Sequence, residues 1–149
     1  MREAIGGTIL LYIVLIFLFV YIAFMAIVIN YGRVFRSKNS VVTYIEQYEG
    51  FSEDTKAVID SQVIVKQGYN GPVCVCYNLA PNNNKYYNIK LVVEFTMPLV
   101  SKSMYPKLAI TGQTSGIPTL KNGGNKDIDS IPTCDEGYAM VSGTGSCSW

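Results

Sequence analysis

The sequence predicts an α+β fold, in which a long N-terminal transmembrane helix continues as an amphipathic helix and packs on a small antiparallel β-sheet domain. Three observations carry this prediction: an uncharged apolar run, an apolar stripe at helical spacing after it, and several β-prone segments separated by turn-forming residues. Because short turns join successive strands, we expect an antiparallel meander. We divide the chain into a transmembrane helix (1–30), an amphipathic helical extension (31–50) and a β-rich domain (51–149).

The apolar run from Thr8 to Ile29 contains no charged residue, glycine or proline. At about 1.5 Å per residue it would reach roughly 33 Å, enough to cross a hydrocarbon core of about 30 Å. A buried core helix is disfavoured, because so small a remainder could not cover a helix that is apolar on every side. A cleaved secretory signal is disfavoured because its apolar stretch is shorter and residues 30–38 offer no small-x-small cleavage site. We therefore expect a permanent anchor in the lipid bilayer.

Beyond the membrane run, apolar residues recur on one face at helical spacing, which predicts an amphipathic continuation packed on the domain. The residues assigned to this helix-to-domain packing are Val34, Val41, Ile45 and Tyr48. Lys38 interrupts the stripe, although its long stem can lie along an apolar surface. Gly50 is the expected end of the helix. Gly32 and the Asn39-Ser40 pair leave a loop after the membrane as the alternative.

The β-rich domain is expected to begin with a short helix. Ser52 followed by Glu53 and Asp54 has the chemistry of a helix start, and we expect this helix to end before Val63. The predicted strands are Val63–Gln67, Val73–Tyr77, Tyr87–Phe95 and Lys107–Gly112. The third of these alternates apolar with mostly polar residues, which predicts one buried and one wet face.

Four cysteines lie in the polar region: Cys74, Cys76, Cys134 and Cys147. The first two are two residues apart on a predicted strand, so their side chains share a face and a bond between them would strain the backbone. Both remaining pairings would tie the C-terminal loop to the sheet, and each bridge would stabilise the fold by roughly 4 kcal/mol in the chain-entropy model. Free thiols and a four-cysteine zinc site are the alternatives. The C-x-C spacing and the wide second pair disfavour zinc.

The sequence gives no indication of catalysis. Histidine is absent, which removes the commonest general base and metal ligand, and neither a phosphate-binding glycine loop nor a C-x-x-C redox motif occurs. Asp127, Asp129, Asp135 and Glu136 lack the spaced calcium-binding pattern and are expected to be solvated. The net charge is +1 without a basic tract, so nucleic-acid binding has no electrostatic support. We expect no enzyme activity, no cofactor and no nucleic-acid partner.

Charge and cysteine content make opposite predictions about topology. Arg33, Arg36 and Lys38 follow the membrane run, and the positive-inside rule then favours a cytoplasmic C-terminal domain. An even number of cysteines in a small loop-rich domain favours an oxidising compartment instead. We expect a single-pass protein of the cell membrane with an extracytoplasmic C-terminal domain, in conflict with the positive-inside rule.

The order of parts resembles that of type IV pilins and pseudopilins, in which a long N-terminal helix leads into a small β-domain with a C-terminal disulfide loop. The segment Asn30-Tyr-Gly-Arg33 resembles the phenylalanine-glycine-arginine element of TadE-like minor pilins of tight-adherence systems. The stretches Ile89–Val100 and Pro106–Ser115 are similar to the TadE pattern of a strand, a proline turn and a second strand ending in small polar residues. Gly6 and Gly7 stand where a prepilin peptidase would cut, but the fifth position after them lacks the usual carboxylate.

This resemblance implies a minor pilin- or pseudopilin-like structural or assembly component of a tight-adherence pilus or related secretion system. Its apolar helix would pack among other pilin-like subunits or on an assembly platform, and it could enter a surface filament. We assign this helix packing to Ile13, Phe17, Val20, Phe24 and Val28. The alternative is a membrane-anchored extracellular binding module, an adhesin or ligand-recognition domain, that does not polymerise.

Overall fold

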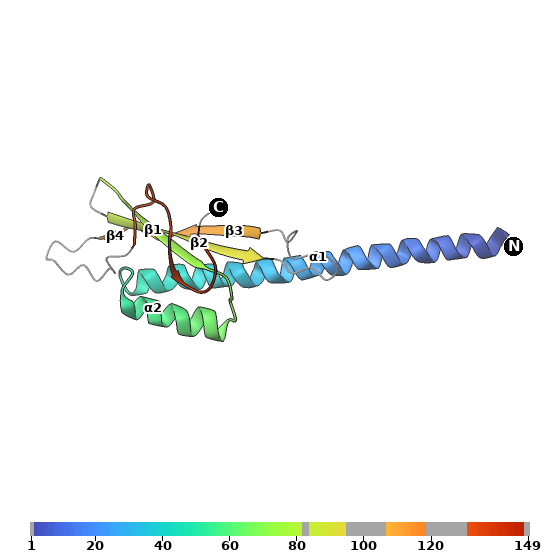
Figure 1. Ribbon diagram of the computed structural model, residues 1–149, viewed down its shortest axis with the longest axis horizontal. Helices are drawn as coiled ribbons and strands as arrows, with labels where there is room; N and C mark the ends of the chain where they lie inside the picture. Colours follow the sequence, from blue (N-terminus) through green and yellow to red (C-terminus); the bar gives the residue numbers. More distant parts are fainter. Residues whose placement is uncertain (1, 82–83, 95–106, 119–130, 148–149) are drawn as a thin grey trace.

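A computed structural model describes residues 2–81, 84–94, 107–118 and 131–147. Its elements are α1 (Arg2–Gln47), α2 (Glu53–Ile59), η1 (Asp60–Lys66), β1 (Val73–Leu79), β2 (Asn84–Glu94), β3 (Lys107–Gln113), β4 (Ile117–Pro118) and β5 (Ala139–Ser142). The strands form one antiparallel sheet, and the long apolar α1 packs on it (Figure 1). The predicted α+β fold class is confirmed, and the architecture is pilin-like.

The molecule consists of a two-layer body and one projecting arm (Figure 1). The second half of α1 lies beside the sheet, with α2 alongside, and the first half extends away from the body alone. With 46 residues, α1 is roughly 69 Å long at about 1.5 Å per residue. The chain's N-terminus therefore lies far from the domain, whereas the C-terminal segment returns to the sheet.

The sheet is a meander of β1, β2 and β3, and the C-terminal strand β5 pairs with the other edge of β1. Its strand order is β3-β2-β1-β5, and β4 pairs with the start of β2. β1 lies along β2 from Val73 opposite Leu91 to Leu79 opposite Lys85. The C-terminal segment also meets the far end of β1, where the Tyr77 N–H donates to the Pro132 carbonyl at 3.1 Å. β1 is thus contacted on both edges.

The core lies between the sheet and the helices. Its fully buried side chains come from every layer: Val41, Ile45, Phe51, Ile59, Val63, Val73, Val75, Ile89 and Leu91, with Tyr87 nearly so. The predicted alternation of the third strand is present in β2, where Tyr87, Ile89 and Leu91 face this core. Phe95 lies outside the described residues.

The expected amphipathic continuation of the membrane helix is present, because α1 runs unbroken through Gly32 and Asn39. Val34 is buried on its domain side together with the core residues of α1. The stem of Lys38 lies against β3, where a side chain at Gly112 would come within 3.0 Å of its Cδ. The Lys38 ammonium lies 4.5 Å from the Phe35 ring centroid, so a lysine occupies the packed stripe without burying its charge.

The prediction that Tyr48 packs on the domain is wrong, because α1 ends before this residue. The Gly50 N–H donates to the Ile45 carbonyl at 3.0 Å and the Glu49 N–H to the Glu46 carbonyl at 3.2 Å, the pattern of a Schellman turn. Glu49 takes the left-handed conformation, with φ of 55°, at the position where glycine is preferred. The helix therefore stops at Gln47, and Tyr48 lies in the turn, 37 % exposed, outside the buried face to which the seven-residue spacing assigns it.

The predicted strand Val63–Gln67 is wrong. α2 begins where expected, with Ser52 as its N-cap in a capping box with Thr55. The helix does not end before Val63, because the chain continues as the π-helix η1. Ile59 and Val63 are both fully buried, so the helical path keeps this apolar side on the core, and that burial outweighs the β preference of the Val-Ile-Val run.

Candidate functional site

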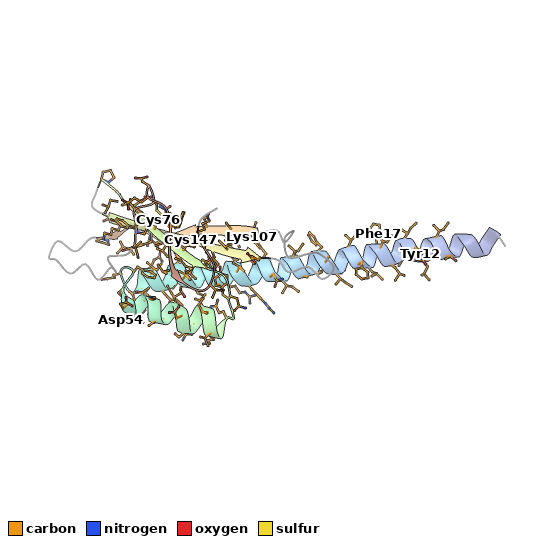
Figure 2. The ribbon with its side chains drawn as sticks, in the orientation of Figure 1. Tyr12, Phe17, Asp54, Cys76, Lys107 and Cys147 are labelled. Atoms are coloured by element: carbon orange, nitrogen blue, oxygen red, sulfur yellow. A yellow bond between two sulfur atoms is a disulfide. The ribbon has the colours of Figure 1, made fainter. Side chains whose placement is uncertain are left out.

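The N-terminal part of α1, as far as Ile29, is an apolar surface that the described chain leaves uncovered. Its most apolar stretch is 0 % buried, and Figure 2 shows Tyr12 and Phe17 projecting from the bare arm of the helix. By length and composition, α1 is the one helix among the described residues that could cross a membrane. Because leaving such a surface in water is costly, lipid or another protein has to cover it.

The residues assigned to helix packing all lie on this surface: Ile13, Phe17, Val20, Phe24 and Val28. Their exposed fractions run from 48 % at Val28 to 75 % at Phe17. Spacings of three and four residues place them on one side of α1. Tyr31 and Phe35 continue the same spacing past the membrane run, with ring centroids 6.4 Å apart. The structure thus brings the five together on one side and leaves them open to a partner.

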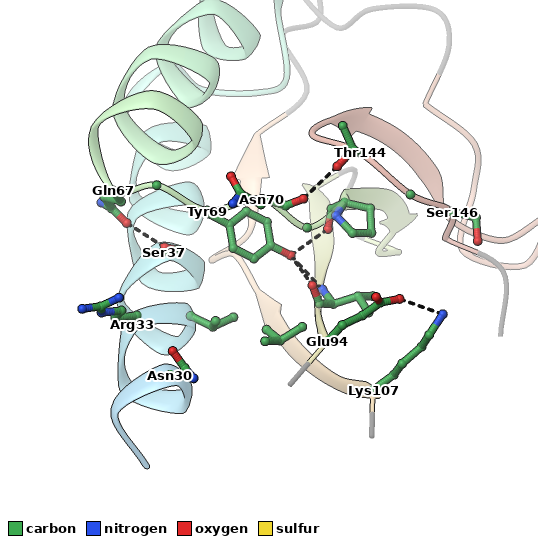
Figure 3. Close-up of a pocket in the computed structure, with 17 residues that line it drawn as sticks. Asn30, Arg33, Ser37, Gln67, Tyr69, Asn70, Glu94, Lys107, Thr144 and Ser146 are labelled. Carbon is green, nitrogen blue, oxygen red and sulfur yellow. Dashed lines mark hydrogen bonds and ion pairs between the residues drawn. The ribbon is translucent and has the colours of Figure 1, made fainter. Parts of the chain in front are cut away.

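A cavity of about 770 Å³ lies where α1 meets the domain (Figure 3). Its wall comes from residues 30–37 of α1, residues 67–72 before β1, the facing ends of β2 and β3, and residues 144–146 of the C-terminal loop. It therefore begins one residue after the apolar run ends. Ser37 ties two of its walls together, because its hydroxyl donates to the Gln67 side-chain carbonyl at 2.8 Å.

Tyr69 organises the floor of this cavity. β1 pairs with β2 only as far as Leu91, and the Tyr69 hydroxyl takes the place of the missing strand partner for Val92. It accepts from the Val92 N–H at 2.9 Å and lies 2.8 Å from the Val92 carbonyl, to which it can donate. Burial raises the pKa of the Tyr69 phenol, and the hydrogen bond with the Val92 backbone lowers it by less. The phenol is therefore neutral and structural.

Gly71 allows the segment before β1 to approach Val92 of β2 closely. A side chain at Gly71 would collide with the Val92 carbonyl oxygen and with the Tyr69 ring. On its other side this segment contacts the C-terminal loop, where the Thr144 hydroxyl donates to the Asn70 carbonyl at 2.8 Å. Because only glycine leaves room for backbone to approach backbone so closely, the segment before β1 is fixed between β2 and the C-terminal loop.

The four cysteines form two disulfides that hold the C-terminal segment on β1. Cys74 bonds to Cys147, 73 residues away, and Cys76 bonds to Cys134, 58 residues away. This is one of the two pairings that the strand geometry leaves open. The bonded cysteines offer no thiolate to zinc, and the described residues contain no cluster that could hold a metal ion. Asp127 and Asp129 lie outside the described residues, whereas Asp135 and Glu136 are exposed.

Three charged residues line the cavity: Arg33, Glu94 and Lys107. Arg33 lines it and Arg36 does not, although both are exposed on α1. The Glu94 carboxylate lies 2.9 Å from the Lys107 ammonium where β2 ends and β3 begins. Because both partners are about half exposed, this ion pair contributes little to stability.

Sequence reasoning missed this cavity. Residues 68–72 predict only a turn. Nothing in the sequence distinguishes Tyr69 from the other tyrosines of the chain, and tyrosines in β-rich regions usually serve packing. The one available signal is the Gly-x-x-Gly-Pro spacing around Tyr69, because a second glycine just before a strand indicates a close backbone approach.

No family model, curated protein or solved structure matches the chain. The pilin-like architecture therefore rests on the structure alone, and an architecture does not by itself assign a function.

Proposed function

We propose that this protein is a pilin-like structural or assembly component, anchored in the cell membrane by α1 with its C-terminal domain outside the cytoplasm. The apolar half of α1 would pack among other pilin-like helices, in the bilayer or in the core of a surface filament, or against an assembly platform. Its role would be helix packing and not catalysis. The observation that carries the proposal is the contrast within α1, whose first half is apolar and uncovered while its second half is packed on the sheet.

The assembly proposal is tested by photo-crosslinking in cells. A photoreactive phenylalanine analogue replaces Phe17 on the assigned side or, as the matched control, Ile22, which lies on the opposite side of the helix at about 100° per residue. Both side chains are more than half exposed, so neither replacement disturbs the domain. We expect protein crosslinks from position 17 and mainly lipid adducts from position 22. Equal protein crosslinking would contradict the assigned side, and none at either position would contradict assembly.

The extracytoplasmic location is supported by the disulfides, which suit an oxidising compartment. Intact cells are treated with a membrane-impermeant maleimide before and after reduction by an impermeant reductant. We expect labelling only after external reduction. Free thiols that label only after lysis would place the domain in the cytoplasm, where the positive-inside rule puts it.

Membership of a tight-adherence system is the finer part of the proposal. It is supported by the Asn30–Arg33 and β2–β3 sequence patterns, although residues 95–106 between these strands lie outside the described part of the chain. Genes for a secretion ATPase and a polytopic membrane platform next to this one are expected. A neighbourhood without them would count against this assignment and leave the pilin-like architecture in place.

The second candidate is a membrane-anchored extracellular binding module that does not polymerise. The cavity of about 770 Å³ favours it, because its volume falls within the range of small-molecule sites, about 300–1,000 Å³. Residues 31–149 without the membrane run are expected to be monomeric under either proposal. Absence of crosslinks from position 17 in the full chain would favour the binding module.

A further inference from the structure

The cavity lies at the level of the lipid headgroups if α1 spans the bilayer, and this inference rests on that part of the proposed function. Arg33 is four residues beyond Ile29, or about 6 Å along the helix axis. The headgroup layer extends roughly 5–7 Å from each side of the hydrocarbon core. Because α1 is unbroken here, no linker separates the cavity from the membrane surface.

The groups around the cavity suit that layer. Tyr31 is exposed just past the apolar run, where tyrosine is typical of a membrane interface. Arg33 and Arg36 are exposed on the same turns, and the first acidic residue of α1 after the run is Glu46. Figure 1 shows that β2 ends and β3 begins on the side of the sheet nearest the exposed half of α1, so the Glu94–Lys107 pair faces the same way.

Polar atoms also line the cavity. Asn30 on α1, Asn70 before β1 and Ser146 in the C-terminal loop contribute amide and hydroxyl groups around the space shown in Figure 3. A phosphate needs several donors and at least one cation, and a guanidinium matches its geometry with two parallel hydrogen bonds. Arg33 is the cation that α1 contributes to this wall, and Figure 3 shows its exposed side chain on the Gln67 side of α1.

We propose that the cavity binds the phosphate headgroup of a lipid in the adjacent leaflet, with Arg33 as the principal cation. The ligand chemistry is a phosphate ester, and its source is the membrane. Arg33 then has a role outside the cytoplasm, which accounts for a positive charge after the membrane run on the side that the positive-inside rule disfavours. Glu94 limits the affinity, because its carboxylate repels the phosphate.

The test uses the purified full chain in detergent micelles, titrated with phosphatidylglycerol and followed by native mass spectrometry. The variant is Arg33→Gln and the matched control is Arg36→Gln, which removes the same charge three residues away from an exposed site outside the cavity wall. We expect the dissociation constant to rise about tenfold or more in Arg33→Gln, because the variant loses a charge-assisted hydrogen bond to the phosphate. In Arg36→Gln it should change less than about twofold. Equal changes would overturn the site in favour of a general surface attraction.

A gain-of-affinity variant guards against misfolding. Glu94→Gln removes the carboxylate from the wall, and we expect phosphatidylglycerol to bind about two- to threefold more tightly. An affinity that does not rise would overturn the placement of the phosphate in this cavity. Displacement of the lipid by inorganic phosphate at millimolar concentration would overturn the membrane as its source. None of these readouts depends on assembly, which the crosslinks from position 17 test separately.

Discussion

The two halves of α1 are one continuous helix, yet they differ in what covers them. Ile16 in the first half is 63 % exposed, whereas Ile45 in the second half is fully buried. The same residue type thus stabilises the domain in one half and does nothing for it in the other. Apolar residues along α1 therefore serve two separate purposes: one set packs within the chain, and the other faces an environment outside it.

The largest effect expected is the loss of a disulfide. Changing Cys74 and Cys147 together to alanine should lower the free energy of unfolding of the domain by about 4 kcal/mol, because the bond closes a loop across 73 residues. Denaturant unfolding of the full chain in micelles, followed by near-ultraviolet circular dichroism, measures this loss. The far-ultraviolet helical signal of the uncovered half should survive the transition. Its disappearance in the same step would show that the two halves are not independent.

The most direct comparison of the two halves uses one substitution at two places. Ile45→Ala should destabilise the domain by about 3 kcal/mol, because it leaves a cavity in the core. Ile16→Ala should leave the unfolding midpoint unchanged, since no described part of the chain covers it. The same denaturant titration measures both. A shift of similar size in Ile16→Ala would mean that the first half also supports the domain.

Tyr69→Phe tests the junction between the halves and the sheet. Removing the hydroxyl should cost about 2 kcal/mol, because the buried Val92 N–H loses its partner. The raised pKa adds a pH dependence. The folded chain keeps the phenol neutral where the unfolded chain ionises it, so the stability that Tyr69 contributes is complete below pH 10.0 and falls as the pH rises above it. Between about pH 8 and about pH 11, the unfolding midpoint should decline less in Tyr69→Phe than in the parent chain.

The smallest effect lies at the end of the packed half. Glu49→Gly should stabilise the domain by about 1 kcal/mol, because glycine takes the left-handed conformation at this position without the steric cost of a side chain. Thermal unfolding checks the gain. Glu46→Gly is the control in the helix itself, where glycine should destabilise by more than about 1 kcal/mol, because it also removes the carboxylate that accepts hydrogen bonds from Ser115. A loss in both variants would mean that the turn after α1 is not held as described.

Sequence alone predicts the parts of this fold that depend on local chemistry. The uncharged run, the Ser52 cap and the alternation in β2 each act within a few residues, and each is found where expected. The Val63–Gln67 segment fails because its structure is decided by burial beside Ile59, which is a tertiary effect. The Tyr48 assignment fails because a seven-residue spacing does not show where a helix stops.

The candidate sites differ in the same way. The uncovered side of α1 follows from spacing within one helix, so residues such as Phe17 can be chosen from the sequence. The cavity is built from five separate segments of the chain, and no local pattern brings Arg33, Tyr69 and Thr144 around one space. The disulfide pairing is of this kind too, because Cys74 and Cys76 share a strand face and only the path of the C-terminal loop decides between partners.

The Cys74–Cys147 bond also determines how the protein carries a mechanical load. Tension between the exposed half of α1 and Cys147 passes from Cys74 directly across the bond, so the chain between these cysteines, β2 and β3 included, does not bear the load. The segment between the end of α1 and Cys74 can unfold before the disulfide bears the force, and fully extended it would span at most roughly 90 Å at about 3.4 Å per residue. Under such a load the chain would yield first at α2 and η1 and keep most of its sheet.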